Sequence, residues 1–231
     1  MREISASELR EHGLFVASPQ FGGQCSTIFA RSLADLAIVS GNWRFPLETC
    51  FYMNESLIMR GRNNCVDAFL KQSKAQHLLF IDADIGFTAQ DAMELLILQI
   101  QNPEYEIIGA PYKRKALNAG YAFDYKQDID FGAKEPVEVW GIGTGFMLIR
   151  RDVFSKFSKE FPQYRYLSDD QPGDYESGKE VGMYFHAEID PGSRRYLSED
   201  YWFSRRCKEV GIRTWLCPWM KLRHAGTYIF E

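Results

Sequence analysis

Short apolar runs alternate with longer segments of helical periodicity through the first half of the chain. The runs, bounded by glycine, proline or polar residues, predict buried strands at 13–18, 47–53, 77–81 and 106–109. Apolar positions three or four apart predict helices from Ser26 to Gly41, from Asn54 to Leu70 and from Thr88 to Asn102. Asn54 is the candidate N-cap of the second helix, and Thr88-Ala-Gln-Asp91 is a capping-box pattern at the start of the third. This order of strands and helices predicts an α/β fold with a mostly parallel central sheet flanked by helices.

The second half has a different pattern. Apolar residues predict strands at 137–140, 146–149 and 213–217, and a helix from Ser198 to Val210. Polar residues, glycine and proline dominate residues 167–194, which predicts a long mobile loop. The chain of 231 residues is therefore expected to form one domain, 1–231, whose second half adds an antiparallel extension to the sheet.

Charge and composition exclude several classes of function. The net charge is −4 and the pI is about 5.7, so the chain has no basic surplus for binding a nucleic acid. The first residues are polar, unlike a signal peptide, and no apolar run approaches the ~18–20 residues that span a bilayer. The five cysteines form no Cys-x-x-Cys pair and are expected to be free thiols, which favours a cytoplasmic location.

The strongest candidate for chemistry is Asp82-Ala83-Asp84, directly after the apolar run at 77–81. Asp-x-Asp alone is a common pattern, and a second copy at 128–130 follows no predicted strand. Open α/β sheets bind ligands beyond the carboxyl ends of their strands. Residues two apart on an extended chain point to one side, so both carboxylates can face one magnesium or manganese ion. The alternative is that both aspartates only cap the next helix or lie in a solvated turn. In that case no positive charge would offset the repulsion between the two carboxylates.

The segment LLFIDADIGF, residues 78–87, resembles the Asp-x-Asp region of the GT-A glycosyltransferases. The longer run ESLIMRGRNNCVDAFLKQSKAQHLLFIDADIGF is similar to small viral and bacterial members of that superfamily, such as the first domain of a multidomain chlorella-virus glycosyltransferase. The resemblance extends through Tyr112 and resumes near the C-terminus, whereas residues 120–195 do not match. It implies a GT-A-like fold with a nucleotide-sugar-binding half, 1–115, and an acceptor-side half, 116–231.

The resemblance also implies a metal site. In this family the second aspartate of the motif binds the metal and the first contacts the ribose or the metal, which assigns these roles to Asp84 and Asp82, with Ala83 beside the nucleotide. A histidine near the end of the domain commonly adds a ligand, and His224 is the candidate here. A nitrogen ligand favours manganese, although magnesium can serve. The alternative for His224 is an ordinary surface or core histidine.

Further nucleotide contacts are implied at two places. The loop after the first strand lies against the base and ribose in this family, which assigns contacts to Ala17, Ser18 and Pro19, with Gln20 as a further candidate and an ordinary turn as the alternative. Arg60 and Arg62 precede the motif on a predicted helix, and residues two apart cannot share a helix face. We favour Arg60 as the arginine that faces the site, because a guanidinium suits base edges and diphosphate oxygens.

Candidates in the second half concern the sugar and the acceptor. Gly143, in the glycine-rich turn 141–145, is expected to let the backbone approach the sugar, although a plain hairpin turn is an alternative. Glu199 and Asp200 resemble the acidic pair that removes the acceptor's proton in inverting enzymes or contacts the sugar in retaining ones. Their alternative is favourable charge at a helix N-terminus. The basic residues 113–115 can reach phosphate or acceptor, or form a solvated face.

The function expected from these features is metal-dependent glycosyl transfer. The donor is a nucleotide-diphosphate sugar, by resemblance a UDP-sugar, and the acceptor is a glycan or another hydroxyl compound. A haloacid-dehalogenase-type phosphatase also places two aspartates after an apolar strand, but its motif continues with Gly-Thr where this chain has Ile85-Gly86-Phe87. A non-catalytic carbohydrate-binding module is the third possibility, and it needs neither a nucleotide crevice nor alternating strands and helices.

Overall fold

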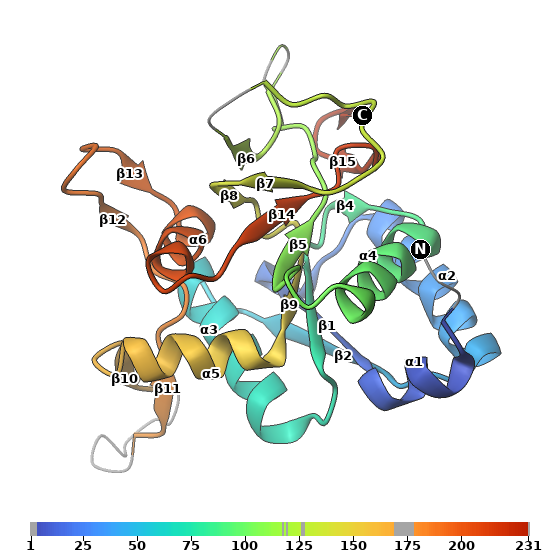
Figure 1. The fold of residues 1–231 in the computed structure, drawn as a ribbon, viewed down its shortest axis with the longest axis horizontal. Coiled ribbons are helices and arrows are strands. Elements are labelled where there is room, and N and C mark those ends of the chain that lie inside the picture. Colours follow the sequence, from blue (N-terminus) through green and yellow to red (C-terminus); the bar gives the residue numbers. More distant parts are fainter. Residues whose placement is uncertain (1–3, 117, 119, 126–127, 169–177, 231) are drawn as a thin grey trace.

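The computed structural model of the chain is built around one seven-stranded sheet (Figure 1). The structure describes residues 4–116, 118, 120–125, 128–168 and 178–230. The strands of the sheet lie in the order β2-β1-β3-β9-β5-β14-β7. Their bounds are β1 (Leu14–Gln20), β2 (Leu47–Met53), β3 (His77–Ile81), β5 (Ile107–Gly109), β7 (Val137–Val139), β9 (Phe146–Arg150) and β14 (Thr214–Leu216).

Most strands of this sheet run in one direction. β1 is parallel to β2 and β3, and β14 is parallel to β5. β9 pairs antiparallel with both β3 and β5, and β7 pairs antiparallel with β14, so only β9 and β7 are reversed among these strands. The predicted α/β class with a mostly parallel sheet is confirmed, and the architecture is consistent with a GT-A-like fold. The second half nevertheless does more than extend the sheet, because its strand β9 lies between two strands of the first half.

Helices cover both faces of the sheet. In Figure 1, α1, α2 and α4 lie on one side, and α3, α5 and α6 lie on the other. None of the helices in the described ranges is long and apolar enough to cross a membrane. Their bounds are α1 (Ala6–His12), α2 (Thr27–Trp43), α3 (Ile58–Gln72), α4 (Ala89–Gln101), α5 (Arg151–Glu160) and α6 (Glu199–Glu209).

The two layers of helices create two hydrophobic cores, and β3 contributes to both. Leu78 and Phe80 pack in the core on the α3, α5 and α6 side, whereas Leu79 and Ile81 pack in the core on the α2 and α4 side. All four side chains are fully buried. A strand covered on both faces needs apolar residues at every position, which explains why residues 77–81 show no alternation.

Smaller antiparallel sheets surround the central one. The sheet that matters for the site is β16-β15-β4, in which His224 pairs with Ile85 and Arg223 with Gly86. It brings the C-terminal part of the chain beside the end of β3. The short elements are η1 (Phe21–Gly23), β4 (Ile85–Gly86), β6 (Phe123–Asp124), β8 (Gly141–Ile142), β10 (Arg165–Leu167), β11 (Glu180–Gly182), β12 (Glu188–Ile189), β13 (Tyr196–Leu197), β15 (Arg223–Ala225) and β16 (Ile229–Phe230).

The beginnings of α3 and α4 differ in how well the sequence predicted them. The predicted capping box is present at α4, where Thr88 accepts a hydrogen bond from Asp91 N and the Asp91 carboxylate accepts one from Thr88 N. The predicted cap at Asn54 is wrong. Asn54 has a positive φ of 62° in a turn after β2, and α3 begins only at Ile58. The Glu55 carboxylate, which accepts a hydrogen bond from Leu57 N at 2.9 Å, satisfies the backbone there instead.

The segment predicted as a mobile loop, 167–194, is largely structured where it is described. It contains β11 and β12, and Tyr184 and Phe185 are buried in the core beside α3. Asn63 on α3 fixes this stretch, because its side chain accepts hydrogen bonds from Tyr184 N and Phe185 N and donates one to Phe185 O. Part of the predicted loop is therefore packed against α3, and its mobility stays a prediction. Residues 169–177 lie outside the described residues.

All five cysteines are free thiols, as expected. Cys65, Cys207 and Cys217 are buried in the core, Cys50 is half-buried and Cys25 is exposed. Burial raises the pKa of the Cys207 and Cys217 thiols well above the ordinary value, so both remain protonated apolar side chains.

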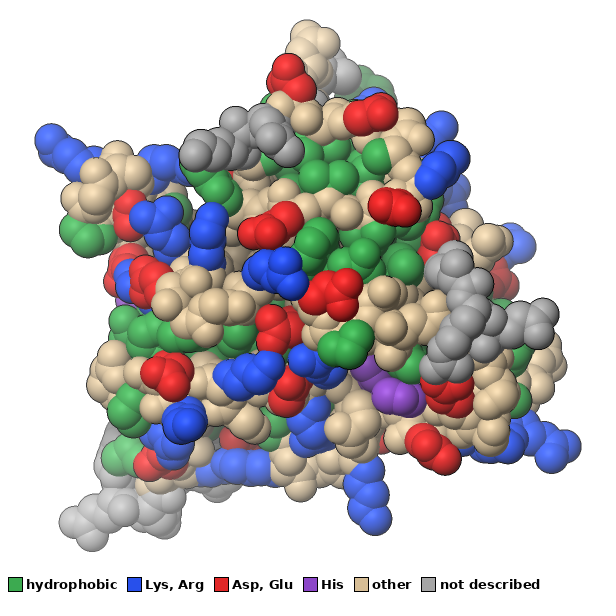
Figure 2. Space-filling view, in the orientation of Figure 1, with side chains coloured by type: hydrophobic (Ala, Val, Ile, Leu, Met, Phe, Trp, Pro, Cys, Tyr) green, Lys and Arg blue, Asp and Glu red, His purple; other side chains and the backbone are tan. Residues whose placement is uncertain are grey.

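The described surface carries charges of both signs. Figure 2 shows acidic and basic side chains intermingled on the face drawn, without a field of one sign. Many pair locally, such as Arg31 with Asp35 at 3.5 Å on α2, where both side chains are exposed. Exposed pairs of this kind contribute little to stability. The charges that affect function must therefore be sought in a concave and partly buried setting.

Candidate functional site

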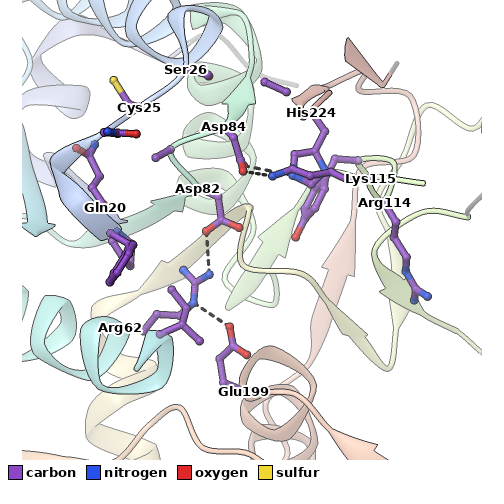
Figure 3. A pocket seen from close by; sticks show the side chains of 18 residues that line it. Gln20, Cys25, Ser26, Arg62, Asp82, Asp84, Arg114, Lys115, Glu199 and His224 are labelled. Atoms are coloured by element: carbon purple, nitrogen blue, oxygen red, sulfur yellow. Dashed lines mark hydrogen bonds and ion pairs between the residues drawn. The ribbon is translucent and has the colours of Figure 1, made fainter. Parts of the chain in front are cut away.

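A cavity of about 860 Å³ opens beyond the carboxyl ends of β1 and β3. This is the edge where open α/β sheets bind ligands, and cavities of this size suit small molecules. Figure 3 shows its charged side chains converging from several elements. The lining residues come from the segments after β1, β3 and β5, from α3 and α6, and from β15: Pro19, Gln20, Phe21, Gln24, Cys25, Ser26, Ile58, Arg62, Asp82, Ala83, Asp84, Tyr112, Arg114, Lys115, Glu199, His224, Ala225 and Gly226.

Arg62 joins three elements at the floor of the cavity. Its Nη2 donates to Asp82 Oδ1 at 2.8 Å and its Nε donates to Glu199 Oε1 at 3.1 Å (Figure 3). The guanidinium is only 3% exposed and lies over the ring of Phe80. Burial alone would lower the pKa of Arg62, but the two carboxylates raise it above its ordinary value, so the group stays charged. Arg62 therefore holds α3, the end of β3 and the start of α6 in a fixed arrangement.

The structure reverses the choice between the two arginines. Arg60 pairs with Glu55, with Nε to Oε2 at 2.5 Å, and it does not line the cavity. Arg62 lies on the buried face of α3 with Val66 and Phe69, at spacings of four and three residues. Of the two arginines, Arg62 and not the favoured Arg60 lines the cavity.

Asp84, the second aspartate of the motif, contacts Lys115 and His224. Its Oδ2 forms an ion pair with Lys115 Nζ, and its Oδ1 lies 3.2 Å from His224 Nε2. Burial would raise the pKa of the Asp84 carboxyl, but its contacts with His224 and Lys115 outweigh burial and lower it. Asp84 is thus held as a carboxylate at the cavity wall, and Ala225 N donates to its backbone oxygen at 2.8 Å.

His224 is held in one tautomer by the backbone. Its Nδ1 lies 2.7 Å from the carbonyl oxygen of Lys113, and because a carbonyl can only accept, Nδ1 carries the hydrogen. The other ring nitrogen, Nε2, faces Asp84 Oδ1 at 3.2 Å. The ring also packs edge-on against Tyr112, with centroids 5.3 Å apart. Such a second contact on the far nitrogen is the usual support of a metal-binding histidine.

The predicted metal ligands are only partly assembled. Asp84 and His224 lie together, whereas Asp82 is turned to Arg62. Within the described ranges, no three His, Cys, Asp or Glu side chains lie close enough to hold a metal ion. The remaining pair nevertheless fits a cation, because Asp84 Oδ1 is buried without a well-formed hydrogen bond and lies 3.2 Å from His224 Nε2. One oxygen and one nitrogen donor favour manganese over magnesium.

The first residue of β1 that lines the cavity is Pro19, two residues later than predicted. Ala17 and Ser18 are fully buried within β1 and do not line the cavity, whereas Pro19 does. The reason is that β1 continues to Gln20, in parallel register with β2, so the carboxyl end of the strand comes later. Phe21, missed by the sequence analysis, lines the cavity and is 76% exposed. An aromatic residue followed by two glycines was the available signal.

Ser26 and Ala83 connect this wall to the motif. Ser26 N donates to the backbone oxygen of Ala83 at 2.8 Å, so the start of α2 is fixed to the turn that carries both aspartates. Ala83 lines the cavity as predicted. Because the Ala83 carbonyl is occupied, its contribution to the wall is its position between the two carboxylates.

Gly143 has a different role from the one predicted. It does not line the cavity, and a side chain at Gly143 would collide with the hydroxyl of Tyr112. A side chain at Gly145 would lie 2.6 Å from Tyr112 Cζ, and Gly145 N donates to the Tyr112 hydroxyl at 3.1 Å. The glycines therefore seat the buried Tyr112, and it is Tyr112 that reaches the cavity.

The two acidic residues at the start of α6, Glu199 and Asp200, lie in different surroundings. Glu199 lines the cavity, whereas Asp200 does not. The Asp200 carboxylate accepts hydrogen bonds from Ser198 Oγ and from Tyr201 N, the latter at 2.8 Å. Burial and the charge of Glu199 raise the pKa of Asp200 to about 6. Of the two candidates, only Glu199 is placed to contact a bound molecule.

The raised pKa of Asp200 gives a pH-dependent prediction. Folded Asp200 keeps its proton to about pH 6, whereas the unfolded chain releases it near pH 4. The stability that protonation contributes is therefore present below about pH 4 and lost as the pH rises to about 6, by at most about 3 kcal/mol. Urea unfolding between pH 4 and 7 should show this fall in the native chain and not in Asp200→Asn. Parallel profiles of the two proteins would contradict it, and Asp128→Asn is the control.

Comparison with known proteins gives structural neighbours only. No protein-family model and no curated protein matches the sequence. The structure is similar to that of A197 from STIV, with a TM-score of 0.58 and 18% identity over 93% of this chain and 86% of that chain. Weaker matches are S. aureus TarS 1–349 (TM-score 0.46, 12% identity, 88% of this chain, 57% of that chain) and a glycosyltransferase involved in the glycosylation of the major capsid of PBCV-1 (0.36, 11%, 72% and 71%). At these identities, the likeness to A197 is one of fold.

Proposed function

We propose that the chain is a metal-dependent glycosyltransferase that moves a sugar from a nucleotide-diphosphate donor to a hydroxyl acceptor. The observation that carries the proposal is the pairing of Asp84 with His224 at the end of β3, beside a cavity that also holds Glu199. A pair of side chains able to hold a cation and a carboxylate able to act as a base would then surround one space, which supports metal-dependent glycosyl transfer. The choice of a uridine donor rests on the resemblance of residues 78–87 to the GT-A motif.

Asp84 Oδ1 and His224 Nε2 would hold the cation. When bound, a divalent cation neutralises the negative charge that develops on the departing diphosphate. The chain contributes orientation. The Lys113 carbonyl fixes the imidazole, and the pairing of His224 with Ile85 fixes the strand that carries it. The cation pair is therefore built from two segments about 140 residues apart that the small sheet β16-β15-β4 holds together.

Glu199 is the residue placed to handle the acceptor's proton. Arg62 Nε donates to its Oε1 at 3.1 Å and orients the carboxylate at the cavity floor. In an inverting reaction, this carboxylate takes the proton of the acceptor hydroxyl while the oxygen bonds to the anomeric carbon and the bond to the diphosphate breaks. In a retaining reaction, it contacts the transferred sugar instead. Asp200, turned away from the cavity, supports α6 rather than the reaction.

The segment after β1 supplies the surface for the nucleotide. Phe21 presents an exposed aromatic ring at the cavity, and bases stack on such rings with a free energy of about 1–3 kcal/mol. Gln20, 7% exposed, offers an amide with both donor and acceptor atoms next to that ring. Neither contact requires a charge, so the charged groups remain available for the diphosphate and the cation.

The proposal is tested by titrating uridine diphosphate into the protein by calorimetry with Mn²⁺, and again after chelation. We expect binding that needs the metal and weakens at least about tenfold in Asp84→Ala. Asp128→Ala, in the other Asp-x-Asp sequence, is the matched control and should bind as the native chain does. Absence of binding with every metal would contradict a uridine-nucleotide site. Release of inorganic phosphate from simple monoesters would instead favour a phosphatase, and binding of sugars without hydrolysis of a UDP-sugar would favour a carbohydrate-binding module.

A further inference from the structure

Lys115 occupies an unusual place, because its ammonium group lies on the same carboxylate that faces His224. Asp84 divides its two oxygens, with Oδ2 paired to Lys115 Nζ and Oδ1 directed at His224 Nε2 (Figure 3). All three side chains line the cavity. The ammonium is therefore a positive charge at the edge of the position that a metal ion between Asp84 and His224 would take.

The backbone on both sides of this lysine is anchored. Lys113 forms a bridge with Tyr121, and its carbonyl oxygen contacts His224 Nδ1. Arg114 N donates to Gly120 O at 3.2 Å. The lysine side chain runs past Gly226, where an added Cβ would lie 3.3 Å from Lys115 Cδ, so the absence of a side chain at 226 leaves room for it. The lysine is thus directed toward Asp84 by the fold, rather than sharing the freedom of an ordinary surface lysine.

The two aspartates of the motif have counter-ions of different kinds. Asp82 is paired with Arg62, which is 3% exposed and is fixed from a second side by Glu199. Asp84 is paired with Lys115, which is 40% exposed. A buried guanidinium with two carboxylate partners cannot leave without stranding charges, whereas a half-exposed ammonium on a flexible chain can move into solvent at little cost. One of the two counter-ions is therefore permanent and the other is exchangeable.

We propose that Lys115 is an exchangeable counter-ion of Asp84: it holds the cation position until a divalent cation takes its place, and the displaced ammonium then binds the diphosphate of the nucleotide. The first step concerns the chain and a metal ion alone. The second step rests on the proposed function. A lysine displaced from Asp84 remains beside the cavity, because Tyr112 and Lys113 anchor the backbone that carries it. An ammonium there pairs with phosphate oxygens by charge-assisted hydrogen bonds.

The exchange predicts effects of opposite sign on two ligands. In Lys115→Met, Mn²⁺ binding without nucleotide is expected to strengthen roughly three- to tenfold, because the competing cation is gone. With saturating Mn²⁺, the same variant is expected to bind uridine diphosphate roughly tenfold more weakly. Mn²⁺ binding is measured by electron paramagnetic resonance of the free ion, and nucleotide binding by calorimetry. Lys221→Met, which removes the same charge from an exposed position outside the cavity, is the control and should change neither value.

The two measurements, Mn²⁺ binding and uridine diphosphate binding, test this inference separately from the proposed function. Stronger Mn²⁺ binding by Lys115→Met supports the exchange even if uridine diphosphate binds to neither protein, an outcome that would contradict only the nucleotide and the second step. Unchanged or weaker Mn²⁺ binding by the variant, or no Mn²⁺ binding by either protein, would overturn the exchange. If Lys115 only supported the fold, Lys115→Met would weaken the binding of both Mn²⁺ and uridine diphosphate. That result would also overturn the proposed exchange. The melting temperature of each variant shows whether the fold is intact.

Discussion

Arg62→Met is expected to lower the free energy of unfolding by about 3 kcal/mol, because it leaves two carboxylates near each other without their shared counter-ion. The Arg62 guanidinium is 3% exposed, and the side chains of Asp82 and Glu199 are 29% and 14% exposed. Methionine fills much of the space but donates no hydrogen bond, so Asp82 Oδ1 and Glu199 Oε1 each lose a partner. Both carboxylates line the cavity, and ligand binding should fail with the same change.

Urea unfolding at pH 7 measures this loss of stability. Arg60→Met is the comparison on the same helix, and it should cost less than Arg62→Met because it strands one carboxylate, that of Glu55, rather than two, and Arg60 is itself 30% exposed. Adding Asp82→Asn to Arg62→Met removes one of the stranded charges and should restore part of the stability. Equal losses for Arg60→Met and Arg62→Met would show that Arg62 is not the central counter-ion of the site.

Glu199→Gln is expected to lower the rate of sugar transfer about a hundred- to ten-thousand-fold if its carboxylate is the base. Glutamine keeps an oxygen that can accept from Arg62 Nε, so the orientation at the cavity floor should persist while the ability to take a proton is lost. Binding of uridine diphosphate with Mn²⁺ should remain close to that of the native chain. The expected defect is therefore in kcat and not in donor affinity.

The rate is measured as release of uridine diphosphate from a UDP-sugar, either to water or to an acceptor found by screening. Asp200→Asn serves as the comparison, because Asp200 lies next in sequence but outside the cavity lining. We expect it to retain most of the activity near pH 7. Loss of activity in Asp200→Asn with retention in Glu199→Gln would reverse the assignment of the two residues.

The fold could be predicted where local pattern decides it. The run at 77–81 and the capping box at Thr88 depend on residues close in sequence, and both elements were predicted at the right place. The position of β9 was not predictable in this way. Its apolar run indicates a buried strand, but its place between β3 and β5 depends on pairings with residues about 40 to 70 positions away. The neighbours of a strand are set by tertiary packing, and the local periodicity of apolar residues in the sequence carries no information about them.

The candidate site shows the same limit. Asp84, Glu199 and His224 were recognised because each follows or begins a clear element or matches a family motif. The choice of Arg60 failed, although Arg62 shares the spacing of the buried residues Val66 and Phe69 and could have been recognised from it. The ion pair of Asp84 with Lys115 was beyond a sequence argument, because it arises from the segment after β5.

The central position of β9 has a consequence for synthesis on the ribosome. β1, β2, β3 and β5 emerge before residues 146–150, yet in the described sheet β3 and β5 pair with β9 and not with each other. Until β9 has emerged, β3 presents one uncovered apolar edge and β5 has no partner in the sheet. We expect ribosome-bound chains arrested before residue 146 to recruit chaperones and to resist native folding, and chains arrested well beyond residue 150 to lose that association.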